Sequence, residues 1–325
     1  MLEKLDELLK SPSITPRIKT LISTLTEEGK LALNDFYDEK SDFYQHAEPM
    51  LIANKFNCDP NIFPNLYHYT SIDVLKNIIS KKKIYLGSIH SMNDQKDGLY
   101  AFELGAIELE SLGASKEEIQ DFNLFNKNIP RNNYIWSFSA NDHSQSLQHY
   151  GEIALSFNNQ DIQYSLSKHF SKGANDFSEF SRGNGFSFPL KVEYDIKTQL
   201  EYIKPVVKEW LYAYRNINVD SSDMLEIMQC SAQAMFLFSL CFKNPDLYQE
   251  EEIRFVVVKI NGKENDIEPE IIFNGKPVVS LEITPSLIKS VILSHEVFEQ
   301  ETNIRNILNQ SNFTNTTIEK TRLPY

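Results

Sequence analysis

The sequence predicts an α+β fold, and three observations support that class. Short apolar segments of strand length recur from residue 65 to the C-terminus. Helical patterns fall between them at irregular intervals, without the strict strand–helix alternation of a doubly wound sheet. Residues 1–60 and 197–243 read as helical throughout. We therefore expect an N-terminal helical extension, 1–60, and a main domain, 61–325, that contains a mixed sheet and a helical insertion near 197–243.

The N-terminal extension begins with leucines at helical spacing in MLEKLDELLK. The segment SPSITP interrupts this pattern. Thr15 is a suitable N-cap, and Pro16 suits the first position of a helix, so a second helix is predicted from Pro16 to about Phe36.

The main domain begins with a strand, LYHYT, and Ser71 then caps the helix IDVLKNIISKK. SQSLQHYG is predicted to be a short helix that Gly151 ends, and two helices fill 197–243, the second of them largely apolar. Further helices are expected at 99–112, 115–126 and 297–309. Strands are expected at 66–70, 83–88, 134–140, 152–158, 189–195, 250–260, 290–294 and 316–325.

Composition limits the classes of function. The chain has 325 residues and a net charge of −13, which disfavours nucleic acid and anionic membranes as partners. Its three cysteines show no CxxC spacing, so neither a zinc site nor a disulfide framework is expected. The N-terminus lacks an apolar signal segment, and the apolar run AMFLFSLCF is too short to span a bilayer. We expect a cytoplasmic protein, or one secreted into a host cell without a classical signal peptide.

Three polar segments are candidates for chemistry. In YHYT, strand alternation puts His68 and Thr70 on one face, although a histidine bonded to a backbone carbonyl is the commoner outcome. In SFSANDHSQSLQHYG, Ser137 and Ser139 share a face, and Tyr150 follows at the end of the short helix; a serine-rich turn with a packing tyrosine is the alternative. The turn-rich SMND is a weaker, fourth candidate.

The segment QEEEIRFVVV is the third candidate. A two-residue repeat places Glu250, Glu252 and Arg254 on one face, just before a buried valine run. Burying a carboxylate beside an apolar core costs free energy, so such a residue is expected to have a function or a paired charge. A solvated strand start, in which Arg254 pairs with a glutamate for about 0–1 kcal/mol, is an equally good interpretation.

Taken in order, the segments YHYTS, SMND, SFS…HYG…ALSF and YQEEEIRFV resemble a bacterial domain family of unassigned function. That family in turn is similar to a divergent branch of the ADP-ribosyltransferase superfamily. The resemblance covers residues 65 to about 260, and the order and spacing of the motifs carry it. It implies a split, strongly bent mixed sheet with helical insertions.

The resemblance also implies an NAD site. His68 would contact the NAD ribose, and Thr70 shares its strand face. Ser137 and Ser139 would occupy the place of the serine-containing strand beside the nicotinamide, and Tyr150 would match the tyrosine on the helix after that strand. For the pyrophosphate of NAD, the candidates are Lys83, Arg131 and Arg182.

In the same comparison, Glu252 would be the catalytic glutamate and Glu250 the upstream acid of a Glu-x-Glu pair, a signature similar to that of arginine-modifying members. A first-strand histidine belongs instead with the His-Tyr-Glu branch, so the chain mixes features and the acceptor residue stays open. Glu251 is an alternative catalytic residue if the strand bulges. A fixed carboxylate suits this chemistry because cleavage of the nicotinamide–ribose bond develops positive charge on the ribose.

The expected function is therefore that of a mono-ADP-ribosyltransferase, which cleaves NAD and modifies a protein side chain, arginine favoured. It would act as a toxin, a defence factor or an effector. The alternatives are an NAD glycohydrolase with the same residues, and a non-catalytic interaction protein on the same fold. A nucleic-acid enzyme is disfavoured by the charge, although some members of the superfamily modify DNA or RNA.

Overall fold

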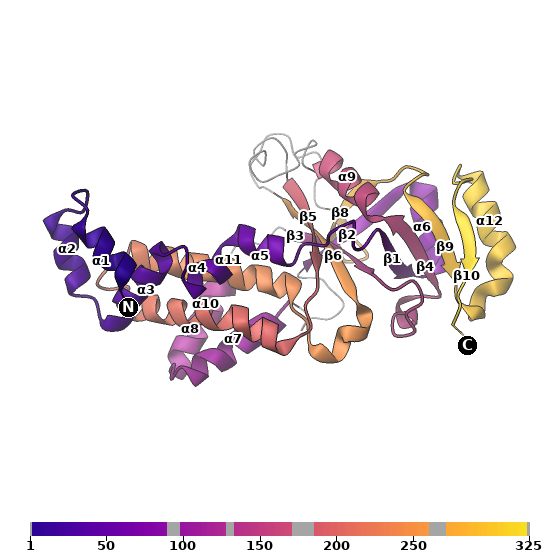
Figure 1. The fold of residues 1–325 in the computed structure, drawn as a ribbon. Helices are drawn as coiled ribbons and strands as arrows, with labels where there is room; N and C mark the ends of the chain where they lie inside the picture. The colour runs from indigo at the N-terminus through magenta and orange to yellow at the C-terminus, as the bar shows by residue number, and fades with distance from the viewer. Residues whose placement is uncertain (1, 90–97, 128–132, 171–184, 260–270, 324–325) are drawn as a thin grey trace. The chain divides into compact units, whose positions relative to one another are not determined.

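The structure is a computed structural model that describes residues 2–89, 98–127, 133–170, 185–259 and 271–323 (Figure 1). The chain divides into two compact units. A helical unit comprises 1–56, 96–130 and 193–245, and a sheet unit comprises 57–95, 131–192 and 246–325. Helices accompany a mixed, open sheet, so the predicted α+β class is confirmed.

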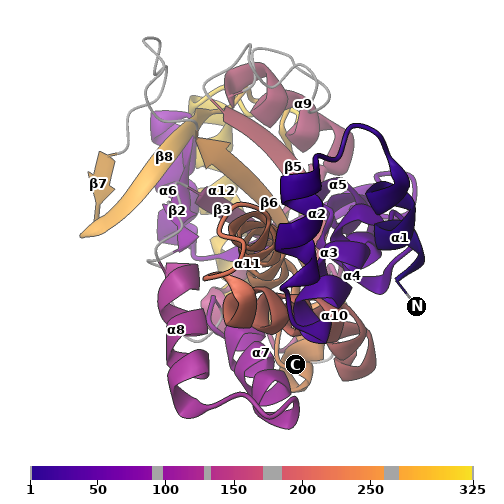
Figure 2. The same cartoon turned by 90° about the vertical axis from the view of Figure 1, so that its left-hand side faces the viewer.

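The helical unit draws its helices from three separate segments of the chain (Figure 2). They are α1 (Glu3–Lys10), α2 (Pro16–Ser23), α3 (Glu27–Tyr37), α4 (Asp42–Ala47), α5 (Pro49–Lys55), α7 (Tyr100–Ser111), α8 (Lys116–Lys127), α10 (Ile196–Asn216) and α11 (Asp223–Cys241).

The core of this unit forms around α10 and α11, which pack along each other. The Asp195 carboxylate caps α10 by accepting from the Thr198 N–H at 3.0 Å. Trp210 of α10 and Phe238 of α11 are fully buried. Of the described helices, α11 is the one long and apolar enough to cross a membrane, and most of it is buried inside the unit, as in the core helix of a globular protein.

The structure refines two expectations about the helices. The helix predicted from Pro16 to Phe36 is divided, because Thr26 begins a new helix by accepting from the Gly29 N–H at 3.1 Å. The segments 1–60 and 197–243 also do not stay separate, since residues from both, with α7 and α8, make up one unit. Short amphipathic helices need a partner for their apolar face, and α10 and α11 provide it.

The sheet unit contains the following strands and helices. They are β1 (Asn65–Thr70), α6 (Ile72–Lys81), β2 (Lys83–Ser88), β3 (Asn133–Ser139), β4 (Ile153–Asn158), α9 (Asn159–Phe170), β5 (Gly185–Lys191), β6 (Glu252–Lys259), β7 (Ile271–Phe273), β8 (Lys276–Glu282), β9 (Ile288–Leu293), α12 (Glu301–Gln310) and β10 (Thr317–Lys320), with 3₁₀ turns at Gln148–Tyr150, Pro245–Glu250 and His295–Gln300.

The strands follow the order β10-β9-β4-β1-β3-β2-β8-β7, and β6 pairs with β3 and β5. Pairing is antiparallel except between β10 and β9. Strand β3 pairs with β1 at Ser139 and with β2 at Tyr134 and Ile135. The strands β1 and β2 therefore meet the same edge of β3 at its opposite ends, and Ser137 lies between the two ladders.

One face of the sheet carries the apolar core. Leu66, Trp136, Phe138, Leu155 and Phe255 point to this face and are buried against α6, α9 and α12. Figure 1 shows α12 lying beside β10 and β9 at one end of the sheet. In β3 and β6 this face follows from the alternation of apolar and polar residues, which the sequence makes visible, whereas β1 places His68 and Thr70 on it as well.

Several elements differ from the sequence-based expectation. The strands β7 and β8 and the helix α9 were not predicted. The predicted helix in SQSLQHYG is a single 3₁₀ turn at Gln148–Tyr150. The strand expected at 189–195 is β5, at Gly185–Lys191, and the last helix begins at Glu301, after the 3₁₀ turn His295–Gln300.

Candidate functional site

The candidate site lies on the sheet face opposite the apolar core. The strand registers align five side chains across five neighbouring strands, and all five are polar: Ser290, Ser156, Tyr67, Ser139 and Glu252. We call these residues the polar row. Four of the five are at least nine-tenths buried, and Tyr67 is partly buried. Because neighbouring strands lie about 4.8 Å apart, Tyr67 and Glu252 are separated by roughly 10 Å.

Glu252 ends the polar row and forms a buried ion pair. The Arg254 Nε donates to Glu252 Oε1 at 3.0 Å, and Nη2 donates to Oε2 at 2.9 Å. Arg254 is 1% exposed and Glu252 6%. The expected pairing of Arg254 with a glutamate is therefore present, but it is buried and two-pronged, unlike a solvated strand start.

The turn before β6 separates the three consecutive glutamates. Glu251 has a left-handed backbone, φ 44°, and its exposed carboxylate accepts from the Asn141 Nδ2 at 3.1 Å. Glu250 ends a 3₁₀ turn and precedes the strand. The two-residue repeat used to place Glu250 on the face of Glu252 therefore does not apply, because Glu250 lies outside the strand and the left-handed residue between them interrupts the extended backbone. Glu252 is the glutamate that the strand itself presents.

The two predicted serines have different environments. Ser139 is 1% exposed; its hydroxyl donates to the Glu250 carbonyl at 2.8 Å and accepts from the Asn141 N–H at 3.0 Å. It thus ties the end of β3 to the turn before Glu252. Ser137 lies opposite Arg254 and points to the same face as the polar row.

His68 lies on the other face of the sheet. Its ring contacts Trp136 and Phe138 edge-on, with centroids 6.1 and 5.9 Å apart. Nδ1 lies 2.9 Å from the Ser137 carbonyl oxygen, so the ring N–H donates a hydrogen bond to that carbonyl. Ser137 lies between the β1 and β2 ladders, where neither strand is paired with it. Burial lowers the pKa of His68, and the Ser137 carbonyl partly offsets this effect. The ring is therefore neutral near pH 7, and it does not share the face of Glu252.

Thr70 and Tyr150 lie near the end of β1. Thr70 is buried on the face of His68. Tyr150 is 47% exposed, and its ring lies tilted against His149, with the centroids 3.9 Å apart. Gly151 packs so closely on β1 that a Cβ there would lie 2.0 Å from the Thr70 carbonyl carbon. Glycine is therefore required at this position by close packing, in addition to ending the short turn.

The loop from Asn141 to Tyr150 joins the first strand to the glutamate strand. The Tyr69 hydroxyl donates to the Asn141 carbonyl at 2.9 Å and accepts from the Ser144 N–H at 2.6 Å. On the other side, the Ser146 hydroxyl donates to the Gln249 carbonyl at 3.2 Å. The three sequence segments therefore meet in one unit, although the side chains of His68 and Glu252 do not converge.

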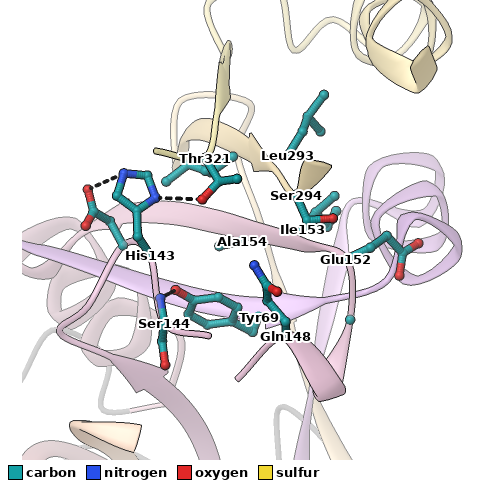
Figure 3. Close-up of a pocket in the computed structure, with 13 residues that line it drawn as sticks. Tyr69, His143, Ser144, Gln148, Glu152, Ile153, Ala154, Leu293, Ser294 and Thr321 are labelled. Carbon is teal, nitrogen blue, oxygen red and sulfur yellow. Dashed lines mark hydrogen bonds and ion pairs between the residues drawn. The ribbon is translucent and has the colours of Figure 1, made fainter. Parts of the chain in front are cut away.

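A shallow hollow lies beside this loop, at the ends of β1, β4 and β9 (Figure 3). His143 bridges Asp142 at 3.4 Å through Nε2 and the Thr321 hydroxyl at 3.2 Å through Nδ1. The buried Ser294 hydroxyl lines the hollow without a partner among the described residues. Its empty volume of about 240 Å³ includes space that is open to solvent, so the hollow encloses little more than room for bound water.

Of the three pyrophosphate candidates, Lys83 is the one that the structure describes. Lys83 is at the start of β2, and its Nζ lies 3.8 Å from the exposed Glu282 carboxylate. Asn93 and Asp94 of SMND, together with Arg131 and Arg182, lie outside the described residues. Of the described residues, no group of three or more His, Cys, Asp or Glu side chains is arranged to hold a metal.

Sequence reasoning missed three members of the polar row: Tyr67, Ser156 and Ser290. The strands of the two serines each offer a weak signal, a single polar residue in an otherwise apolar run, ALSF or SVIL. The signal becomes specific only when the register puts these residues side by side. Burial also raises the pKa of Tyr67, with a further contribution from Asp142, so its phenol stays protonated at neutral pH.

Comparison of the chain with protein-family models, curated proteins and solved structures gives no match.

Proposed function

We propose that the chain is a mono-ADP-ribosyltransferase that uses NAD as its substrate and modifies a protein side chain, with arginine the favoured acceptor. One observation supports this proposal above the others. Glu252 is a buried carboxylate whose orientation is fixed by Arg254, in register with Ser139 and Tyr67 on adjacent strands. A carboxylate fixed before the reaction stabilises positive charge without the cost of reorganisation.

The chemistry assigns distinct tasks to these residues. When the bond between nicotinamide and the ribose C1′ breaks, nicotinamide leaves with the electron pair and the ribose gains positive charge. Glu252 would stabilise that charge, as carboxylates do in glycoside cleavage. The acceptor nitrogen then bonds to C1′ and loses a proton, for which Glu250, by the resemblance, is the proposed base. The half-exposed Tyr150 ring would offer a surface for the nicotinamide.

The split of the sheet also supports this interpretation. The strands β1 and β2 engage opposite ends of one edge of β3, so the sheet opens beside Ser137. A bent, split sheet is the architecture that the resemblance implies. The roles of toxin, defence factor or effector belong to the same proposal.

The test is incubation of the protein with labelled NAD and a cell lysate, followed by measurement of protein-bound label and free nicotinamide. Glu252→Gln should lower both by at least about 100-fold, the effect of removing one transition-state stabilising group. Glu296→Gln is the control, because that carboxylate is exposed, lies in the 3₁₀ turn His295–Gln300 and is not a site candidate. Circular dichroism checks that both variants fold.

Three results separate the alternatives. Nicotinamide release from NAD alone, without labelled protein, identifies an NAD glycohydrolase. Full turnover by Glu252→Gln removes Glu252 from the catalytic role. A wild-type protein that neither releases nicotinamide nor labels protein contradicts the enzyme proposal.

A non-catalytic interaction protein is the second candidate, and one observation favours it. His68, the predicted ribose contact, is held by a backbone carbonyl on the core face instead of facing Glu252. On this interpretation the polar residues serve strand register, and NAD does not bind. Titration calorimetry with NAD decides between the two, since the enzyme must bind its substrate and the interaction protein gives no heat.

A further inference from the structure

Arg254 holds the carboxylate of Glu252 from the same strand. Nε and Nη2 of the single Arg254 guanidinium reach the two oxygens of the Glu252 carboxylate, at 3.0 and 2.9 Å. Both groups are planar, and two parallel hydrogen bonds fix one plane relative to the other. The side chain of Arg254 is 1% exposed and that of Glu252 7%, so bulk water competes little for these bonds.

The strand makes this arrangement possible. Glu252 and Arg254 are two residues apart in β6, so their side chains leave the same face, and the register places them beside Ser139 and Ser137 of β3. The spacing of the strand itself therefore brings the guanidinium to the carboxylate.

We propose that Arg254 is a positioning residue: its two-pronged contact fixes the plane of the Glu252 carboxylate and keeps that group ionised for NAD cleavage. This inference rests on the proposed function. Arg254 itself need not touch NAD. A lysine in its place would keep the positive charge but would lose the planar pair of donors, so charge and orientation become separable.

The experiment measures nicotinamide release by Arg254→Lys over a range of pH and NAD concentration. We expect kcat to fall at least about tenfold while KM changes less than about threefold, because orientation acts on the transition state. We also expect Arg254→Gln to move the acid limb of the pH–rate profile to higher pH, because the ionised carboxylate loses its charged donor.

A matched control is available in the helical unit. The exposed Arg215 makes the same two-pronged contact with Glu118, with Nε–Oε1 2.7 Å and Nη2–Oε2 3.2 Å. Arg215→Lys should leave kcat and the acid limb unchanged. A general effect of replacing a forked arginine would affect both variants alike.

The outcomes are distinct. Suppose that the wild type releases nicotinamide, that Arg254→Lys has the wild-type kcat, and that Arg254→Gln has the wild-type acid limb. The positioning role is then wrong, and the proposed function stands. If the wild type is inactive, the proposed function fails and the inference fails with it. If the variants do not fold, Arg254→Ala with added methylguanidinium is the second test; recovery of folding without any recovery of nicotinamide release overturns the inference.

Discussion

Each of the two units buries a carboxylate, and the hydrogen-bond donors around the two carboxylates differ. In the sheet unit, Arg254 engages both oxygens of Glu252. In the helical unit, Glu209 of α10 is fully buried, and Lys208 Nζ lies 2.8 Å from its Oε1, yet neither oxygen meets hydrogen-bond geometry. Burial raises the pKa of Glu209 to about 7, although the charge of Lys208 opposes this effect.

The difference follows from secondary structure. Alternate residues of a strand leave the same face, so a long arginine can reach straight to a glutamate two positions away. Consecutive residues of a helix do not face each other, so Lys208 approaches Glu209 only obliquely. Burial of a carboxylate is therefore not enough to identify a site. A set of fixed donors around it is the more informative feature.

The largest expected effect comes from breaking the ion pair between Arg254 and Glu252. Arg254→Met leaves the Glu252 carboxylate buried without the two hydrogen bonds from Arg254, so the free energy of unfolding should fall by about 3–5 kcal/mol. Denaturant unfolding measures this. The double variant Glu252→Gln with Arg254→Met should recover most of the loss, because the uncompensated charge is gone. A loss below about 1 kcal/mol in the single variant would show that the pair is not the buried fork described here.

The next effect concerns Glu209 and its pH dependence. Its pKa is raised in the folded state, so the folded protein holds the proton more tightly than the unfolded chain. Stability is therefore greatest below the unfolded value of 4.5 and falls as the pH rises to about 7. Glu209→Gln should remove this decrease and exceed the wild type by about 3 kcal/mol at pH 8. Thermal unfolding from pH 4.5 to 8 measures the difference, and parallel curves for the two proteins contradict it.

The smallest effect concerns His68 and the split of the sheet. His68→Leu leaves the Ser137 carbonyl without its donor and should cost about 1–3 kcal/mol, whereas His68→Asn retains an N–H and should cost less. Because burial lowers the folded pKa, the wild type should lose stability as the pH falls below 6.5. His68→Asn should lack that decrease. Equal stability of the two variants at pH 7 would show that the hydrogen bond to the Ser137 carbonyl does not contribute to stability.

Part of the site was predictable because it is local. Strand alternation alone predicted that Ser137 and Ser139 share a face and that Glu252 and Arg254 do so, and the structure has both pairs on one face. The same rule failed at Glu250, because the left-handed Glu251 breaks the extended backbone. A glutamate rarely adopts a left-handed backbone, so the sequence gives no signal of this conformation.

The sequence by itself determined the α+β class, the apolar face of the sheet and the two helices α10 and α11, because these depend on patterns that repeat over a few residues. Only the tertiary structure decided which polar residues form the polar row, that His68 faces away from Glu252, and that residues from three separate segments make one helical unit. These features depend on strand register and on contacts between distant segments, and a local pattern does not specify them.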